Sequence, residues 1–166
     1  EKLLEKIMLV VPGFSGYKSR EQRREADKII RNFLYSKLQE ARNGLQDIYR
    51  RLAESDATKS LPSIDSLMAI FDRVSERVNH ASYGYAGFFD AIKIDDEELD
   101  RMIAFDTQLV DGAKGLAESV RNFKDQVESG NFENVETHGD QLRKNVMEFE
   151  RTFDERKDII TGVEVG

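Results

Sequence analysis

The sequence predicts an all-α protein, specifically an up-down-up-down antiparallel four-helix bundle with an N-terminal amphipathic segment. The 166 residues include only two prolines and no tryptophan, and 34% are charged, which favours an exposed helical bundle over a sandwich or barrel. Apolar residues recur every three or four positions in four long segments joined by short connections, as expected for antiparallel neighbours. We expect helices at about 19–54, 63–93, 96–128 and 132–160, within a bundle domain that covers residues 18–162.

The first expected helix begins at a capping box and continues through a long apolar stripe. Ser19 and Gln22 stand three residues apart, the spacing at which two side chains satisfy free backbone N–H groups at a helix start. The stripe consists of Ile30, Leu34, Leu38, Ala41, Leu45, Ile48 and Leu52. Pro62 blocks continuation of this helix, and Ser63 is placed to cap the next one.

The second expected helix crosses two glycines, which makes its end ambiguous. Apolar residues at heptad-like spacing run from Ile64 to Ile92, through Gly84 and Gly87. Each glycine costs a helix up to about 1 kcal/mol relative to alanine, so a loop is the alternative. Because the stripe continues, and because helices in a bundle have comparable lengths, we expect this helix to reach about residue 93. The glycines would then line a groove for close helix contact or, less commonly, for a ligand.

The remaining boundaries follow from capping and turn residues. Asp95 with Glu98 marks the start of the third helix, the sequence SGN turns the chain after Glu128, and the fourth helix ends before Gly162. Residues 1–17 form the N-terminal amphipathic segment and a Gly/Pro linker, and residues 163–166 form a tail. We expect the N-terminal segment to pack on the bundle, with a membrane surface or a partner as alternatives.

Charged residues interrupt the apolar stripes near one end of the expected bundle. Counting along antiparallel helices places a polar layer there, made of Arg23, Arg24, Asp27, Tyr85, Asp106 and Arg156. Buried carboxylates are tolerated only when they are paired, so we expect both aspartates to contact these arginines or the tyrosine hydroxyl. Such a layer fixes helix register at some cost in stability. A metal or acid–base site at the two aspartates is the alternative.

Signatures of catalysis are absent from the sequence. The chain has no cysteine, which excludes disulfides, thiolate catalysis and cysteine-ligated metals. It has two histidines but no Glu-x-x-His motif of the kind that binds di-iron sites. Glu133-x-x-Glu136 and Glu155-x-x-Asp158 lie on one expected helix, so these carboxylates cannot converge on a metal ion. No phosphate-binding loop motif occurs. We therefore predict no catalytic residue, no metal ligand and no cofactor.

A basic cluster opens the first expected helix, although the net charge of the chain is −7. With nearby aromatic residues and glycines it forms a candidate surface, made of Tyr17, Lys18, Arg20, Lys28, Arg31, Tyr83, Gly84 and Gly87. Mixtures of basic and aromatic side chains bind nucleic acids and anionic lipids. Pairing within the chain is the favoured alternative, because interleaved charge is usually a solvated face. The acidic candidates for that pairing are Asp90, Asp95, Asp96 and Asp100.

Two segments resemble a family of uncharacterised archaeal and bacterial helical proteins, namely PGFSGYKSREQRREADKIIR and YGYAGFFDAIKI. Members of this family pair a Gly-Tyr-Lys, Arg-Arg-x-x-Asp-Lys segment with a downstream Tyr-Gly-Tyr-x-Gly segment. The resemblance covers most of the chain. It implies a helical protein and, because that family has no established activity, it supplies no catalytic residues.

We therefore expect a non-enzymatic helical protein-interaction or scaffold module, with a protein partner or self-association and no small-molecule substrate. An adaptor that binds nucleic acid or an anionic membrane through the basic start of the first helix is the second hypothesis, and a small-ligand or metal-dependent enzyme is the third. The longest apolar run, Ile7 to Val11, is far shorter than the ~20 residues that span a bilayer. The absence of cysteine fits a reducing compartment, so we expect the cytoplasm, with peripheral membrane attachment as the alternative.

Overall fold

The computed structural model describes residues 2–81, 83 and 87–163. This part of the chain contains helices and no strands, which confirms the predicted all-α class. They form five α-helices: α1 at Lys2–Val10, α2 at Arg23–Ala53, α3 at Leu61–Asn79, α4 at Asp96–Glu128 and α5 at Val135–Thr161. The prediction of a four-helix bundle is not confirmed, because this part of the chain has five helices and not four. None of these helices is long and apolar enough to cross a membrane.

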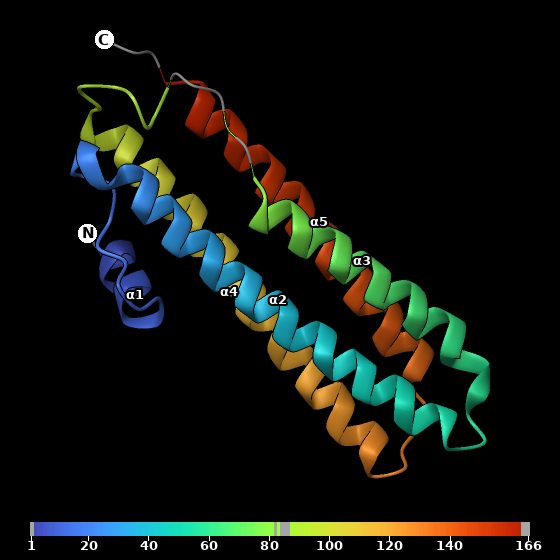
Figure 1. Cartoon of the computed structure of the whole chain (residues 1–166). Coiled ribbons are helices and arrows are strands. Elements are labelled where there is room, and N and C mark those ends of the chain that lie inside the picture. The colour runs from blue at the N-terminus through green and yellow to red at the C-terminus, as the bar shows by residue number, and fades with distance from the viewer. Residues whose placement is uncertain (1, 82, 84–86, 164–166) are drawn as a thin grey trace.

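The four long helices lie side by side, and α1 packs against α4 near one end (Figure 1). Helix α2 contacts α3 and α4, and α5 contacts the same two helices. The apolar stripe of α2 predicted from the sequence is fully buried between them, from Ile30 to Leu52. Burial of such stripes is the main source of stability for helices that are amphipathic.

Helix α4 starts at the capping residue expected from the sequence, whereas α2 and α3 do not. The Asp95 carboxylate accepts a hydrogen bond from the backbone N–H of Glu98 at 2.8 Å. Ser19 makes no side-chain cap, and a short 3-10 helix at Arg20–Gln22 precedes the start of α2. The expected cap at Ser63 is also wrong, because α3 begins at Leu61. Pro62 is tolerated in the first turn, where its missing N–H would have no intrahelical partner.

The largest error of the sequence prediction is the length of the second long helix, which was expected to reach residue 93. Helix α3 ends at Asn79, and residues 87–91 form a turn instead. Gly87 has a φ of 97°, a left-handed conformation that is incompatible with a right-handed helix at this position. Phe88 and Ala91 are buried, as a continued helix would require, but the turn buries them and leaves Ile92 exposed.

This turn covers the end of α5. The backbone N–H of Phe88 donates to the carbonyl oxygen of Ile160 at 2.7 Å. That carbonyl belongs to the last turn of α5, where helix carbonyl groups lack intrahelical donors. A side chain at Gly87 would press against the same carbonyl oxygen, so the close approach requires glycine. The loop after α3 therefore replaces the expected helix with a cap on α5.

The N-terminal segment is part of the core. Ile7 of α1 is buried, and so are Val11, Phe14 and Tyr17 of the segment that joins α1 to α2. Gly13 and Gly16 both have positive φ, which allows this segment to fold back over the end of the long helices. On the surface, Lys6 pairs with Asp111 of α4 at 2.9 Å.

Two glycine substitutions test the loop that caps α5. Gly87→Ala is expected to lower the free energy of unfolding by at least about 2 kcal/mol, because alanine disfavours the left-handed conformation and its Cβ meets the Ile160 carbonyl. Gly115→Ala is the matched control: it lies in α4 with open space around it, and is expected to raise stability by about 0.5–1 kcal/mol. Urea unfolding monitored by circular dichroism measures both values. Unchanged stability of Gly87→Ala would show that this loop is not fixed on α5.

Candidate functional site

A buried polar cluster joins five segments at one end of the molecule. It consists of Tyr17, Asp27, Tyr83, Asp106 and Arg156. Tyr17 lies in the segment before α2, Asp27 in α2, Tyr83 in the loop after α3, Asp106 in α4 and Arg156 in α5. Asp27, Asp106 and Arg156 occupy positions on the core faces of their helices, which explains why three charged side chains meet among apolar neighbours.

Arg156 is the centre of the buried polar cluster, and its side chain has no exposed area. Its Nε donates to Asp106 Oδ1 at 2.8 Å, and its Nη1 donates to Asp27 Oδ1 at 2.5 Å. The same Nη1 donates to the Tyr83 hydroxyl at 2.7 Å, and Nη2 donates to the Tyr17 hydroxyl at 3.1 Å. One guanidinium group thus holds residues from four other segments.

The second oxygen of each carboxylate is also engaged. Asp27 Oδ2 accepts from Arg31 Nε at 3.0 Å, and Asp106 Oδ2 accepts from the Tyr17 hydroxyl. Two carboxylates therefore face two guanidinium groups, and their charges balance. Buried charges are tolerated when they are paired and hydrogen-bonded in this way.

Arg23 and Arg31 extend the cluster onto backbone carbonyl groups. Arg23 Nε donates to the Tyr17 carbonyl at 3.0 Å, and its Nη1 donates to the carbonyls of Phe88 and Ala91 at 3.1 and 2.6 Å. Arg31 Nη1 donates to the carbonyls of Val78 and Asn79, at the end of α3, at 3.3 and 3.1 Å. The Val78 and Asn79 carbonyls belong to the last turn of α3, where helix carbonyls lack intrahelical donors, and the other three lie in segments outside the helices. Arg23 therefore joins the linker between α1 and α2 to the loop between α3 and α4.

The polar layer expected from the sequence overlaps with this cluster only in part. The structure brings Asp27, Asp106 and Arg156 together, and it places Arg23 beside them on backbone carbonyls. Arg24 lies outside, on the surface, and pairs with Asp90 at 2.9 Å. The expected Tyr85 lies outside the described residues. Tyr17 and Tyr83 supply the hydroxyl groups instead.

The candidate surface also divides into two sets. Tyr17 is buried, Arg31 is mostly buried, and Gly87 lies against Ile160, so these three do not form an open surface. Lys18, Arg20 and Lys28 are exposed, Tyr83 is partly buried and Gly84 lies outside the described residues. Of the expected pairs between this basic cluster and the acidic residues at the same end, the described residues show only Arg24 with Asp90.

Sequence reasoning placed Tyr17 on the surface, although one signal pointed to the core. The side chains of Ile7, Val11, Phe14 and Tyr17 follow each other at spacings of three or four and are all buried. Tyr17 also packs edge-on against Phe14 and Phe88, with ring centroids 5.3 and 5.1 Å apart. Pro12, Gly13 and Gly16 lie within this stretch and interrupt a helix, so the spacing could not be interpreted as one face of a helix.

Burial controls the protonation of the cluster. It raises the pKa of Asp106 above the ordinary value of an aspartate, against the opposing attraction of Arg156. Burial also acts to lower the pKa of Arg156, but the carboxylate of Asp106 and the other cluster groups raise it well above its ordinary value. Burial raises the pKa of Tyr17 well above 10 and that of Tyr83 to about 12. Both hydroxyl groups therefore stay protonated at neutral pH.

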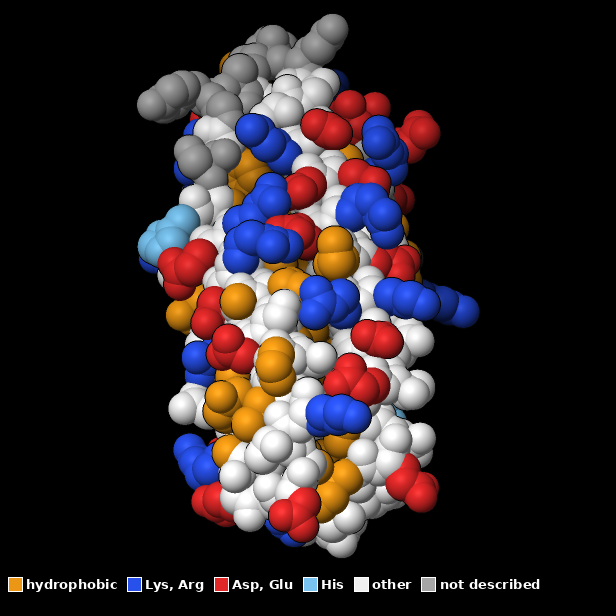
Figure 2. Space-filling model, turned by 90° about the vertical axis from the view of Figure 1, so that its right-hand side faces the viewer, with side chains coloured by type: hydrophobic (Ala, Val, Ile, Leu, Met, Phe, Trp, Pro, Cys, Tyr) orange, Lys and Arg blue, Asp and Glu red, His pale blue; other side chains and the backbone are white. Residues whose placement is uncertain are grey.

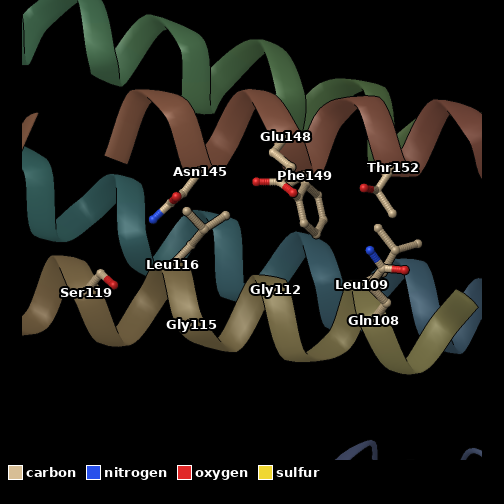
Figure 3. A pocket seen from close by; sticks show the side chains of 10 residues that line it. All are labelled: Gln108, Leu109, Gly112, Gly115, Leu116, Ser119, Asn145, Glu148, Phe149 and Thr152. Carbon is tan, nitrogen blue, oxygen red and sulfur yellow. The ribbon is translucent and has the colours of Figure 1, made fainter. Parts of the chain in front are cut away.

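Among the hollows on the described surface are two that lie along α4. The first, about 340 Å³, lies between α4 and α5 beside Gly112 and Gly115, where Phe149 and Glu148 reach across from α5 (Figure 3). The second, about 640 Å³, lies between α1, the linker and the first two turns of α4. The residues that line the second hollow are Leu3, Leu4, Ser15, Gly16, Tyr17, Lys18, Asp96, Leu99, Asp100 and Ile103.

On the face that carries α3 and α5, basic and acidic side chains are intermixed, and apolar side chains are exposed between them in the middle and lower parts of the view (Figure 2). Arg73 and Arg77 of α3 pair with Glu150 of α5 at 2.8 and 3.0 Å, and Arg77 also pairs with Asp154. Surface pairs of this kind contribute about 0–1 kcal/mol each. In the described part of this face, charges of both signs therefore stand side by side.

The histidines have local partners. His138 stacks on Phe123 with ring centroids 5.0 Å apart, and its Nε2 lies 2.9 Å from Gln126 Oε1. His80 lies beside Glu76 at the end of α3, with 2.9 Å between Nε2 and Oε2. Within residues 2–81, 83 and 87–163, no three His, Asp or Glu side chains gather in an arrangement that could hold a metal ion.

Comparison of the chain with protein-family models, with curated proteins and with solved structures found no match.

The raised pKa of Tyr83 predicts a loss of stability at high pH. The folded protein holds the hydroxyl proton more tightly than the unfolded chain, whose tyrosine pKa is about 10. The stabilisation is therefore full below pH 10 and is lost as the pH rises through 12, by up to about 2.7 kcal/mol. The stability advantage of the native chain over Tyr83→Phe is expected to fall by about 2 kcal/mol between pH 10 and pH 12 in urea unfolding, with the remainder lost outside that interval.

Tyr49→Phe is the matched control for this titration. Tyr49 is partly buried in the second half of α2, at a distance from the cluster, so Tyr49→Phe shows the effect of removing a tyrosine hydroxyl that lies outside the cluster. Equal pH dependence of the native chain and Tyr83→Phe would contradict the assignment of the hydroxyl proton to the cluster.

Proposed function

We propose that the chain is a non-enzymatic helical interaction module, in which the long helices support a binding surface formed by α1 and the start of α4. The proposal covers a protein partner or a second copy of the chain, and it involves no cofactor. Three observations support it: α1 has exposed apolar side chains, the segment after α1 is buried in the core, and the buried carboxylates already have hydrogen-bond partners.

The exposed apolar side chains of α1 carry the proposal. Leu9 is 89% exposed, and Met8 and Leu3 are 45% and 43% exposed, although Ile7 of the same helix is buried. Leu3 and Met8 lie at the two edges of the buried face of this amphipathic helix, and Leu9 lies on its outer side beside the exposed Lys2, Glu5 and Lys6. Burial of such a leucine by a partner would remove apolar area from water and contribute favourably to binding.

The attachment of α1 supports a role in binding. Val11, Phe14 and Tyr17 follow directly after α1 and are buried, and the Tyr17 hydroxyl contacts both Asp106 and Arg156. A helix held this way presents its outer side in a fixed orientation. Fixed surfaces bind with a smaller loss of conformational entropy than mobile ones.

The buried polar cluster supports a structural role better than a catalytic one. All four oxygens of Asp27 and Asp106 accept hydrogen bonds from side chains of the cluster or from Arg31. A general base needs contact with a substrate proton. These carboxylates are almost completely buried and already have partners, so they suit the stabilisation of the fold.

A second candidate function is binding to an anionic surface through the basic start of α2. The observation that favours it is that Lys18, Arg20 and Lys28 are exposed and form no ion pair within 4 Å in the described part of the chain. It is the weaker candidate, because Arg23 and Arg31 of the same stretch bind inside the molecule. It requires salt-sensitive retention on anionic vesicles or nucleic acid that is lost when Arg20 and Lys28 become alanine.

A capture experiment with the variant Leu9→Lys tests the proposed function. The chain is immobilised and exposed to a lysate of its source organism, and captured proteins are compared between the native chain and the variant. Loss of captured partners is expected, because the substitution replaces the most exposed apolar side chain of α1 with a charge that a partner would have to desolvate. Deletion of residues 1–17 is a poorer test, since it also removes the buried side chains of Val11, Phe14 and Tyr17.

Met147→Lys is the matched control for this experiment. Met147 is an exposed apolar residue of α5, and its substitution is expected to leave capture unchanged. Capture that is equal for the native chain and Leu9→Lys, with both proteins folded by circular dichroism, would contradict the proposed function.

A further inference from the structure

We infer that the groove between α1 and α4 binds a basic amphipathic segment of a partner protein. The groove is the hollow of about 640 Å³ described above, and the inference rests on the proposed function because it names the chemistry of the partner at the same end of the molecule. The observation that supports it is that the groove has an apolar floor and acidic side chains along one edge.

The floor of the groove is apolar. Leu4 of α1 and Leu99 and Ile103 of α4 line it, together with the side of Tyr17. Leu4 and Leu99 are only partly buried, so apolar area remains open to a ligand. A hollow of this size lies within the range of about 300–1,000 Å³ that holds ligands of several side chains. Leucine-like side chains of a partner therefore fit the floor.

The edge formed by α4 is acidic. Asp96 and Asp100 line the groove, are exposed and stand four residues apart, one helical turn, on the same side of α4. Neither has an ion pair within 4 Å among the residues that the structure describes, and Lys6 and Arg24 at this end pair with other aspartates. Glu97 beside them adds a further exposed carboxylate. A partner helix with basic residues three or four positions apart matches this spacing.

The charge of the whole chain acts in the same direction. Lys18 is the single basic residue among those that line the groove, and the chain carries a net charge of −7. Net negative charge speeds encounter with basic partners and slows encounter with acidic ones. The groove therefore favours a basic amphipathic segment over an acidic or neutral one.

Binding of a synthetic amphipathic peptide tests this inference. The probe is a peptide of leucine and lysine about 14 residues long, and the comparison is the same peptide with glutamate in place of lysine. The native chain is expected to bind the lysine peptide in fluorescence anisotropy, at least about tenfold more tightly than the glutamate peptide, and more weakly as salt rises.

Charge reversal at each end of α4 distinguishes binding at the groove from nonspecific attraction to the acidic chain. The double variant Asp96→Lys/Asp100→Lys is expected to weaken binding by at least about tenfold. Asp125→Lys/Glu128→Lys changes the same number of exposed charges at the other end of α4 and is expected to leave affinity within about twofold. Asp96→Asn/Asp100→Asn is a milder variant for use if the reversed pair affects folding, and it is expected to weaken binding by a smaller factor.

Three results would overturn the inference: no binding of the lysine peptide, equal binding of both peptides, or equal weakening by the two charge-reversed pairs. Failure of this inference can be told apart from failure of the proposed function. If capture still depends on Leu9 while the peptide fails to bind at the groove, the interaction module stands and only the chemistry of its partner is wrong. If the native chain forms a dimer of twice 19.1 kDa in sedimentation and the peptide does not bind, a second copy is the occupant.

Discussion

The burial of Arg156 is the constraint on which the rest of the structure depends. A guanidinium group without exposed area is tolerated only if several acceptors surround it, and here Asp27, Asp106 and two tyrosine hydroxyls do so. Those acceptors come from four other segments of the chain. A single charge in the core therefore fixes the relative positions of α2, α4, α5, the linker and the loop after α3.

This constraint reaches the surface through the linker. Tyr17, in the linker between α1 and α2, is held at two points: its hydroxyl donates to Asp106, and its backbone carbonyl accepts from Arg23. Phe14 and Val11 of the same linker are buried and extend this contact to α1. The exposed side of α1 and the acidic groove beside it are thereby presented by a rigid support. The proposed binding surface is thus connected to the buried polar cluster through Val11, Phe14 and Tyr17.

The sequence predicted what depends on periodic patterns and missed what depends on long-range contacts. The core stripe of α2 and the cap at Asp95 were predicted because helix spacing and capping chemistry are local. Asp27, Asp106 and Arg156 interrupt apolar stripes, which made them visible as a group. The end of α3 was missed because Phe88 and Ala91 kept helical spacing inside a turn held by Arg23 and Ile160. Tyr17 was missed because glycines break the helix around it.

The coupling free energy between Arg156 and Asp106 tests the central claim most directly. Urea unfolding of Arg156→Met, Asp106→Leu and the double variant provides it. Loss of one partner from a buried ion pair costs about 3–5 kcal/mol, because the other charge is left buried, so the double variant is expected to lose at least about 1–2 kcal/mol less than the sum of the single losses. Losses that add to within about 0.5 kcal/mol would contradict the claim that this buried pair organises the fold.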